Sequence, residues 1–298
     1  MLKHRLITGI LVSAFSLGLI LFAPVWALVG LMCVVYFLAQ LEYCEMCEKA
    51  GYKLERIGIF VCGFLFLFAT LWEIGLLDFL PEYYNFSPTH VLFFFIPVFL
   101  MIQSILRRKT EKAAECLGLS IFGIWYVAVL LSFMARLTLQ WNQPVCSHST
   151  ITDGRIFLIL FIVVVKMSDI GAYAFGSRWG YKIKRRLIPE ISPAKSFPGL
   201  VGAYAGSLFV AISLVFFNWV FEGGTANSPL SYWGFWIIFA LLMATVGVLG
   251  DLAESLLKRS FGVKDSSSRF PGMGGFLDII DSLLFAAPFM YFFVLWFL

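Results

Sequence analysis

Long apolar stretches, separated by short polar segments, follow one another along the whole chain. An apolar helix of about 20 residues is enough to cross a bilayer. The stretch 6–39 is too long for one crossing and holds Pro24 near its middle, so we expect two helices joined by a tight turn there. Seven further stretches have the length of one crossing, at 57–77, 91–106, 117–135, 156–176, 200–221, 232–250 and 283–298. The pattern predicts an all-α polytopic integral membrane protein with about nine transmembrane helices.

The composition excludes a soluble protein. Of the 298 residues, 60% are hydrophobic and 13% are charged, whereas an average soluble domain has roughly 45–50% and about 25%. A soluble enzyme, a disordered chain, a collagen and a coiled coil are therefore excluded. The formal net charge of +4 is small, and we expect no nucleic-acid partner. Lys3 and Arg5 precede the first apolar run, which lacks a small-residue cleavage site, so we interpret this run as a retained span.

The distribution of lysine and arginine predicts the orientation of the chain. Only Arg136 and Arg155 lie in the predicted loops of one side, and Lys166 lies within a predicted span. The other 19 of the 22 lysines and arginines lie on the opposite side, in the segments 1–5, 40–56, 107–116, 177–199 and 251–282. Cytoplasmic segments carry the excess of Lys and Arg, so we expect a cytoplasmic N-terminus and a C-terminus outside.

The two halves of the chain differ in character. Residues 1–155 are mostly apolar helices with short connectors, which predicts an anchoring scaffold. Residues 156–298 contain the longest polar segments of the cytoplasmic side. We therefore expect residues 156–298 to form a catalytic transmembrane domain with its active site at the cytoplasmic face.

Three ionisable residues lie inside the predicted spans, where charge is costly. Lys166 and Asp169 are three residues apart and share one face of a helix. They form either a self-neutralising pair or part of a functional site, and the small and polar residues that follow them favour function. Glu73 lies near the outer end of its span, and we expect its side chain to reach toward the membrane surface.

The basic cytoplasmic segment 177–199 ends in an irregular stretch that contains Pro193 and Pro198. Within this stretch, Ser192 and Lys195 offer a hydroxyl and a cation that can bind a phosphate. Contact with anionic lipid headgroups explains the same residues, at about 1 kcal/mol per cation. The residues alone leave both interpretations open.

The strongest constellation of polar residues directly follows the span 232–250. Its members are spaced i, i+3, i+4 and i+7, so they share one face of a helix. They are Asp251, Glu254, Ser255 and Lys258, and Arg259 follows them. Mg²⁺ takes one or two carboxylates together with phosphate oxygens. The stripe therefore suits a polyphosphate chelated to a metal better than it suits a solvated surface.

A polar, glycine-rich segment precedes the last span. Its first part contains Lys264, Asp265 and three serines, whose backbone and hydroxyl groups can donate to phosphate. Its second part is a glycine-rich turn that allows close approach of the backbone. Asp278 and Asp281 follow, three residues apart at the start of the last helix. Helix capping explains one of them but not both together with Asp251, so we prefer metal binding.

Residues 160–285 resemble the phosphatidate cytidylyltransferase (CDP-diacylglycerol synthase) family. Its signature reads S-x-hydrophobic-K-R-x4-K-D, then a Pro/Gly turn, H-G-G and a final D-R-hydrophobic-D. The matching positions are Ser255, Lys258, Arg259, Lys264, Asp265, Pro271, Gly274, Gly275, Asp278 and Asp281. Upstream motifs of the family are matched at 168–176, 192–195 and 250–255. Met273 stands at the usual His and Ile279 at the usual Arg, so a proton-transferring histidine at position 273 is excluded.

The resemblance implies a reaction of CTP with phosphatidate that gives CDP-diacylglycerol and diphosphate, in phospholipid biosynthesis. It implies one or two Mg²⁺ ions, with the metal ligands Asp251, Asp278, Asp281 and Asp169. The catalytic residues that it implies are Asp251, Asp278, Asp281 and Lys258. The substrate-binding residues that it implies are Ser192, Lys195, Ser255, Arg259, Lys264 and Asp265. A phosphate dianion is already a nucleophile, so no general base is required.

Two other functions stay open from the residues. A CTP-dependent lipid kinase would transfer the γ-phosphoryl group to a polyprenol or similar alcohol with a similar metal site. A transporter that uses Lys166 and Asp169 would need polar groups through the whole membrane depth, whereas the sequence places them near the cytoplasmic face. A structural scaffold leaves the C-terminal carboxylates unexplained. For the favoured function we expect a bacterial plasma membrane, the lipid bilayer as surroundings and a homodimer as a candidate assembly.

Overall fold

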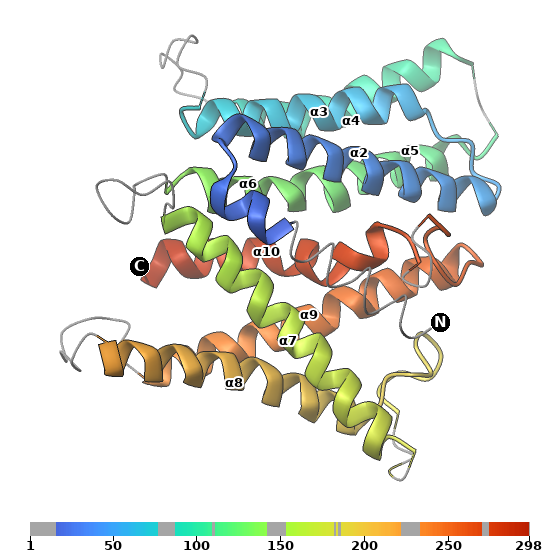
Figure 1. Cartoon of the computed structure of the whole chain (residues 1–298). Helices are drawn as coiled ribbons and strands as arrows, with labels where there is room; N and C mark the ends of the chain where they lie inside the picture. The colour runs from blue at the N-terminus through green and yellow to red at the C-terminus, as the bar shows by residue number, and fades with distance from the viewer. Residues whose placement is uncertain are drawn as a thin grey trace. The chain divides into compact units, whose positions relative to one another are not determined.

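The computed structural model describes residues 16–76, 87–108, 111–141, 153–181, 183, 186–221, 233–269 and 274–297. In these ranges, eight helical segments have the length and apolar composition to cross a membrane (Figure 1). They are α2 (Val25–Lys49), α3 (Arg56–Glu73), α4 (Pro88–Leu106), the continuous segment Ala113–Leu139, α7 (Asp153–Trp179), α8 (Phe197–Phe221), α9 (Trp233–Ser260) and α10 (Leu277–Phe297). The all-α polytopic membrane class is confirmed. The first of the nine predicted spans falls mostly outside the described residues.

The predicted break at Pro24 is confirmed. Residues 16–22 are helical, and Pro24 is the N-cap of α2 with an extended backbone (φ −64°, ψ 158°). The side chain of Arg155 is buried and donates to the carbonyl oxygens of Ile20 at 3.2 Å and Leu21 at 2.9 Å. A cation at the last carbonyls of a helix is stabilised by the helix dipole. Arg155 therefore fixes the end of the helix that Pro24 terminates.

The helix α9 is longer than the predicted span. It has 28 residues, about 42 Å at 1.5 Å per residue, whereas the hydrocarbon core of a bilayer is about 30 Å thick. Residues 251–260 thus continue the helix beyond the apolar stretch that ends at residue 250, which agrees with the helical face expected for Asp251, Glu254, Ser255 and Lys258. No proline interrupts the helix there, and its end comes just before Gly262, whose φ of +70° is left-handed.

The structure divides into two compact units, and the first comprises residues 1–158 and 260–280. Its long central span consists of α5 (Ala113–Ile124), the π-helical turn η1 (Trp125–Val129) and α6 (Leu130–Leu139). Both α2 and α3 pack against this span, and α3 also packs against α4. The buried Tyr36 donates to the carbonyl oxygen of Ile59 at 3.1 Å, and Tyr43 donates to that of Leu119 at 2.9 Å. These two tyrosines tie α2 to its neighbours.

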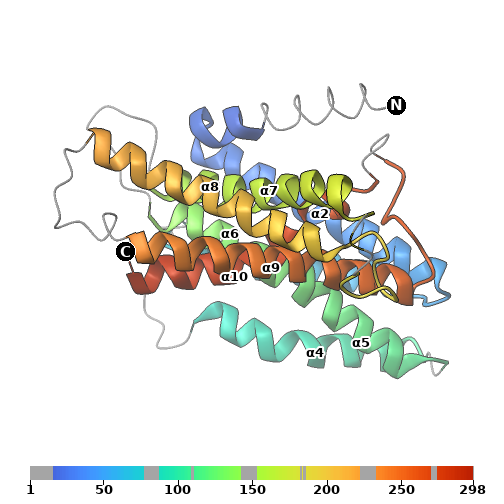
Figure 2. The same cartoon turned by 90° about the horizontal axis from the view of Figure 1, so that it is seen from below.

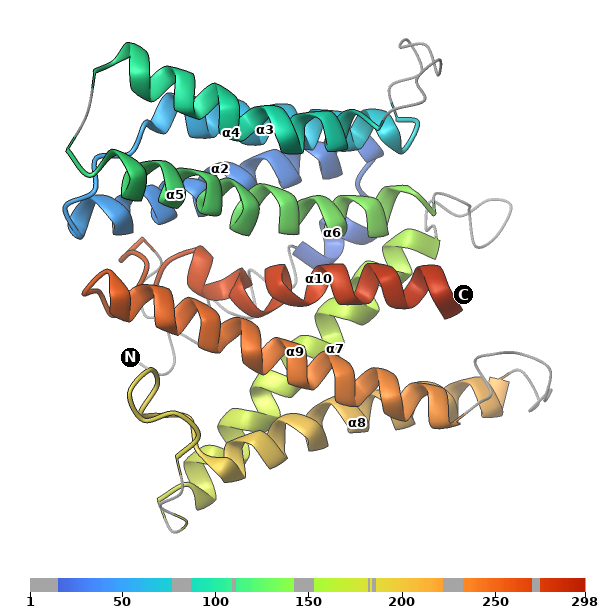
Figure 3. The ribbon, with the colours of Figure 1, turned by 180° about the vertical axis from the view of Figure 1, so that it is seen from behind.

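The second unit comprises residues 159–259 and 281–298, with most of α7 and α10, all of α8 and nearly all of α9. Glycines let α7 and α8 approach closely: a Cβ on Gly171 would lie 2.2 Å from the carbonyl oxygen of Gly202. Small residues at helix crossings serve this purpose in membranes. The helix α9 lies alongside α10 (Figures 2 and 3). The predicted functional division between residues 155 and 156 stays a prediction.

The Glu73 carboxylate, expected to reach toward the membrane surface, binds partners within the protein. Its carboxylate forms an ion pair with Arg136 of α6, and both side chains are mostly buried. It also accepts hydrogen bonds from the backbone N–H of Thr89 at 3.0 Å and from the Thr89 hydroxyl at 2.8 Å. Thr89 and Arg136 lie in α4 and α6, far from Glu73 along the chain, so spacing along α3 could not reveal them. Glu73 joins the ends of α3, α4 and α6.

Replacing Glu73 by Gln should lower the melting temperature of the detergent-solubilised protein by several degrees. The substitution leaves the Arg136 charge unpaired, and breaking a buried ion pair costs about 3–5 kcal/mol. The matched control is Glu48→Gln, because Glu48 pairs with Arg56 and both side chains are more than a third exposed. Such surface pairs contribute about 0–1 kcal/mol. Equal shifts in the two variants would contradict a stabilising role for the Glu73 pair.

Candidate active site

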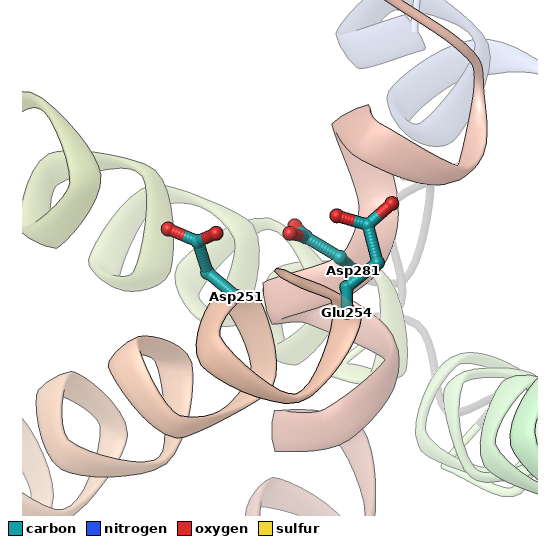
Figure 4. Close-up of side chains that lie close together, drawn as sticks. All are labelled: Asp251, Glu254 and Asp281. Atoms are coloured by element: carbon teal, nitrogen blue, oxygen red, sulfur yellow. The ribbon is translucent and has the colours of Figure 1, made fainter. Parts of the chain in front are cut away.

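Three carboxylates come together from α9 and α10 in the second unit (Figure 4). Asp251 and Glu254 lie one turn apart on α9, and Asp281 lies in the second turn of α10. One oxygen atom of each lies within 4.8 Å of one oxygen atom of the others. Glu254 is fully buried, and Asp281 is 5% exposed. We call these three residues the acidic cluster.

The close contact of α9 with α10 brings the acidic cluster together. A Cβ on Gly250 would lie 2.7 Å from the Cβ of Phe285 and 3.1 Å from the Cα of Ser282. The two helices therefore approach next to the carboxylates, at a position where only glycine fits without a shift of the neighbours. Gly250 precedes Asp251 directly, and Ser282 follows Asp281 directly. The sequence thus builds the contact and the cluster from adjacent residues.

Two lysines balance the charge of the acidic cluster. The Nζ atom of Lys258 lies 2.6 Å from the Oε2 atom of Glu254, one turn away on the same helix. The Nζ atom of Lys195 lies 2.9 Å from the Oδ2 atom of Asp251 and 3.4 Å from the carbonyl oxygen of Val248. Lys195 comes from the segment before α8, so the basic loop contributes directly to the site. Opposite charges held this close partly offset the repulsion among the carboxylates.

The Lys166–Asp169 pair borders the same site. The Nζ atom of Lys166 lies 3.1 Å from the Oδ2 atom of Asp169, as their spacing on one face of α7 allows. The hydroxyl of Ser282 donates to the same Oδ2 atom at 3.3 Å, and Lys166 donates to this hydroxyl at 3.5 Å. Because Ser282 follows Asp281, the ion pair lies next to the acidic cluster.

The remaining candidate residues of the second unit lie around the end of α9. The side chain of Arg259 donates from Nε to the carbonyl oxygen of Ile191 at 3.4 Å. Ser192 follows Ile191, and its carbonyl oxygen accepts from the Lys195 N–H at 3.2 Å, which closes a turn. Ser255 is mostly buried on α9, with 9% of its surface exposed. The turn that contains Ser192 and Lys195 is therefore attached to the helix that carries the acidic cluster.

Asp278 lies in the first unit and serves the loop before α10. Its Oδ2 atom accepts hydrogen bonds from the N–H of Gly275 at 2.7 Å, and from the N–H and the hydroxyl of Ser266 at 3.0 and 2.9 Å. Lys264 and Asp265, which precede Ser266, are exposed. Met273 and Pro271 lie outside the described residues, whereas Ile279 is part of α10.

Sequence reasoning missed Glu42, a fully buried carboxylate on α2. It accepts hydrogen bonds from the Ser267 hydroxyl at 2.6 Å, the Leu277 N–H at 2.8 Å and the Ser266 hydroxyl at 3.0 Å. Arg269 contacts it at 3.4 Å. The sign of it in the sequence is an acidic residue between Leu41 and Tyr43. The lysines and the arginine of the same segment indicate topology and do not point to this carboxylate.

Eight membrane-length helices and a buried, lysine-balanced carboxylate centre define an integral membrane protein whose site could bind a metal. A model of the cytidylyltransferase family matches residues 3–297. The chain belongs to the cytidylyltransferase family, and it is a nucleotidyltransferase.

Curated relatives match nearly the whole chain. The phosphatidate cytidylyltransferase of Haemophilus influenzae is 33% identical over 99% of this chain and 100% of its own length. The proteins of the same name from Synechocystis and Bacillus subtilis are each 28% identical over 98% of this chain, and 96% and 97% of their own lengths are covered. The family relationship therefore includes the N-terminal helices as well as the motif-bearing part.

Proposed function

We propose that this protein transfers the cytidylyl group of CTP to phosphatidate, which gives CDP-diacylglycerol and diphosphate for phospholipid biosynthesis. The observation that carries the proposal is the acidic cluster with Lys195 and Lys258, next to the turn that contains Ser192 and Lys195. Two polyanionic substrates must meet in this reaction, so cations and a divalent metal must offset their repulsion. Full-length relatives that bear the name of this activity support the same assignment.

We assign the metal to Asp251, Glu254 and Asp281, and we propose Mg²⁺, as one ion or two. The donor set fits, because hard divalent cations prefer carboxylate oxygens, and opposite ligands of Mg²⁺ lie about 4.2 Å apart. The oxygens of the acidic cluster already lie within 4.8 Å of one another. When bound, the metal would neutralise charge on the CTP phosphates. The prediction that Asp169 and Asp278 are ligands stays a prediction, and their contacts with Lys166 and Ser266 favour supporting roles.

The lysines and the basic turn are assigned to the phosphates of the two substrates. Lys195, Lys258, Arg259 and Lys264 would hold phosphate oxygens, and Ser192, Ser255 and Asp265 would complete their binding sites. A phosphate oxygen of phosphatidate then forms a bond to the α-phosphorus of CTP. The bond from this phosphorus to the bridging oxygen breaks, and diphosphate leaves with the electron pair. No side chain has to remove a proton, which agrees with Met273 at the position of the family histidine.

The proposed reaction takes place at the cytoplasmic face of a bacterial plasma membrane. The support is the sequence distribution of cations, because the segments before α8 and after α9 both belong to the side rich in Lys and Arg. CTP is a cytoplasmic nucleotide, and phosphatidate presents its headgroup at the membrane surface. We propose no nucleic-acid partner, and a homodimer is the assembly to test.

The experiment that tests this function uses purified protein in mixed micelles with phosphatidate, Mg²⁺ and CTP labelled at the α-phosphorus. Label should enter the extracted lipid fraction as a CDP-lipid, and unlabelled diphosphate should form in equal amount. A parallel reaction with label at the γ-phosphorus and a polyprenol acceptor tests the lipid kinase. Label in the lipid from the γ-position alone would replace the proposal with the kinase, and no labelled lipid from either would reject both.

A further inference from the structure

Glu42 lies on α2, far along the chain from the acidic cluster, yet it is bound to the segment that leads into α10. The hydrogen bonds to its carboxylate come from Ser266, Ser267 and Leu277, with a longer one from Arg269, and these residues are 224 to 235 positions away in sequence. The Leu277 N–H belongs to the first residue of α10. A single side chain thus holds both the loop 264–269 and the start of the helix that carries Asp281.

Burial of this carboxylate requires a compensating role. Glu42 is fully buried, and a buried carboxylate is costly unless donors surround it. An apolar residue at position 42 would pack in an apolar helix without this cost. What an apolar residue cannot do is accept hydrogen bonds from a backbone N–H and two hydroxyls. The role of Glu42 is therefore to fix the positions of the groups that donate hydrogen bonds to it.

The loop closes tightly around Glu42. A Cβ on Gly275 would lie 1.9 Å from the hydroxyl oxygen of Ser266 and 2.4 Å from the Oε2 atom of Glu42. The hydroxyl of Ser266 has one hydrogen and lies about equally far from Glu42 and Asp278, at 3.0 and 2.9 Å. Ser267 and Leu277 each donate to Glu42 alone of these two carboxylates. Glu42 and Asp278 therefore hold the loop from two sides.

A neighbouring glutamate of α2 contacts the loop only at its edge. Glu45 accepts from the Nη2 atom of Arg269 at 2.5 Å, and its side chain is 28% exposed. This hydrogen bond raises the pKa of Arg269 above its ordinary value, so the cation keeps its charge. Because the interaction is open to solvent, we expect it to contribute little to loop placement.

We propose that Glu42 is a positioning residue for cytidylyl transfer. It holds the loop 264–269 and the start of α10 in place without touching either substrate. The inference rests on the proposed function, because the loop carries Lys264 and Asp265 and α10 carries Asp281. A displaced loop would misplace groups that hold phosphate, and a shift of about 1 Å can cost 10²-fold in rate. The contribution of Glu42 is thus to binding and turnover, beyond its contribution to stability.

The test compares Glu42→Gln with the matched control Glu45→Gln in the CDP-lipid assay. Glu42→Gln keeps the shape of the side chain but places an amide where donors converge. We expect kcat/KM for CTP to fall at least about tenfold in Glu42→Gln and to stay within about twofold in Glu45→Gln. Glu42→Asp, which keeps the charge but shortens the side chain, should recover part of the loss. Melting temperatures measured in parallel distinguish a loss of folded protein from a displacement of the loop.

A double-substitution cycle with Ser267→Ala shows whether Glu42 acts through the loop. If it does, Glu42→Gln and Ser267→Ala each remove the same contact, and their effects on kcat/KM combine to less than their product. Hydrogen exchange over 264–269 should also become faster in Glu42→Gln. A Glu42→Gln protein with the kcat/KM of the unsubstituted enzyme overturns the inference, and so does a loss explained by the unfolded fraction. An unsubstituted enzyme that forms no CDP-lipid rejects the proposed function instead.

Discussion

Replacing Asp281 by Asn should reduce cytidylyl transfer by about 100- to 1,000-fold while the protein stays folded. Asn has nearly the same shape, but it removes one of the three negative charges assigned to the metal, and losing one preorganised electrostatic contact costs on the order of 10²–10³ in turnover. Asp281 is 5% exposed and belongs to no loop, so the change acts on the centre itself. The initial rate of CDP-lipid formation measures the loss, and thermal melting in detergent verifies the fold.

The matched control for this substitution is Glu190→Gln, an exposed carboxylate in the same unit. It removes one negative charge from the molecule without changing the acidic cluster, so its rate should stay within about twofold. An Asp281→Asn enzyme that retains more than a tenth of the original rate would contradict the metal assignment. A parallel loss in both variants would indicate a general effect of charge.

Removal of divalent cations should abolish turnover and also lower the stability of the protein. In EDTA, the carboxylates of the acidic cluster repel one another and the substrate phosphates lack a counter-ion. Added Mg²⁺ should restore the rate and raise the melting temperature, since a ligand at 100 times its Kd stabilises the folded state by about 2.7 kcal/mol. The melting experiment needs no substrate, so it reports on metal binding independently of catalysis.

The variant Asp251→Asn provides the control for the metal experiment. Its melting temperature should respond much less to Mg²⁺, because the substitution removes one ligand of the acidic cluster. Glu190→Gln should respond like the unsubstituted protein. Full activity in EDTA would contradict a metal requirement, and an unchanged Mg²⁺ response in Asp251→Asn would place the ion elsewhere.

The positions of the spans were predictable because a bilayer imposes a length on apolar helices. Pro24 marked the boundary before α2 because the stretch 6–39 is too long for one crossing and proline disrupts a helix interior. Pro97 and Pro288, which lie in stretches of one crossing, are inside α4 and α10. The end of α9 was not predictable from hydropathy, because a helix can continue past the membrane surface once its residues become polar. The residues 251–258 belong to the helix through local propensity and side-chain pairing, which hydropathy does not measure.

Some contacts of the candidate site join residues close together in the sequence and were predictable, whereas others join residues far apart and were not. The Glu254–Lys258 pair follows from a spacing of four residues, and its distance of 2.6 Å agrees with that expectation. Which carboxylates of α10 meet Asp251 depends on how α9 and α10 pack, so the spacing of Asp278 and Asp281 could not separate their roles. Glu42 was missed because its partners lie 224 to 235 residues later, where no periodicity connects them.

The pairing of charges within α7 and α9 has a consequence for the biogenesis of the protein. Lys166 with Asp169 and Lys258 with Glu254 each form a pair within about one turn, so these helices enter the translocon with much of their charge already compensated. The described part of α10 contains Asp278 and Asp281 near its start but no lysine or arginine, so its charges are not compensated within the helix. We expect the membrane integration of α10 to depend on the helices made before it.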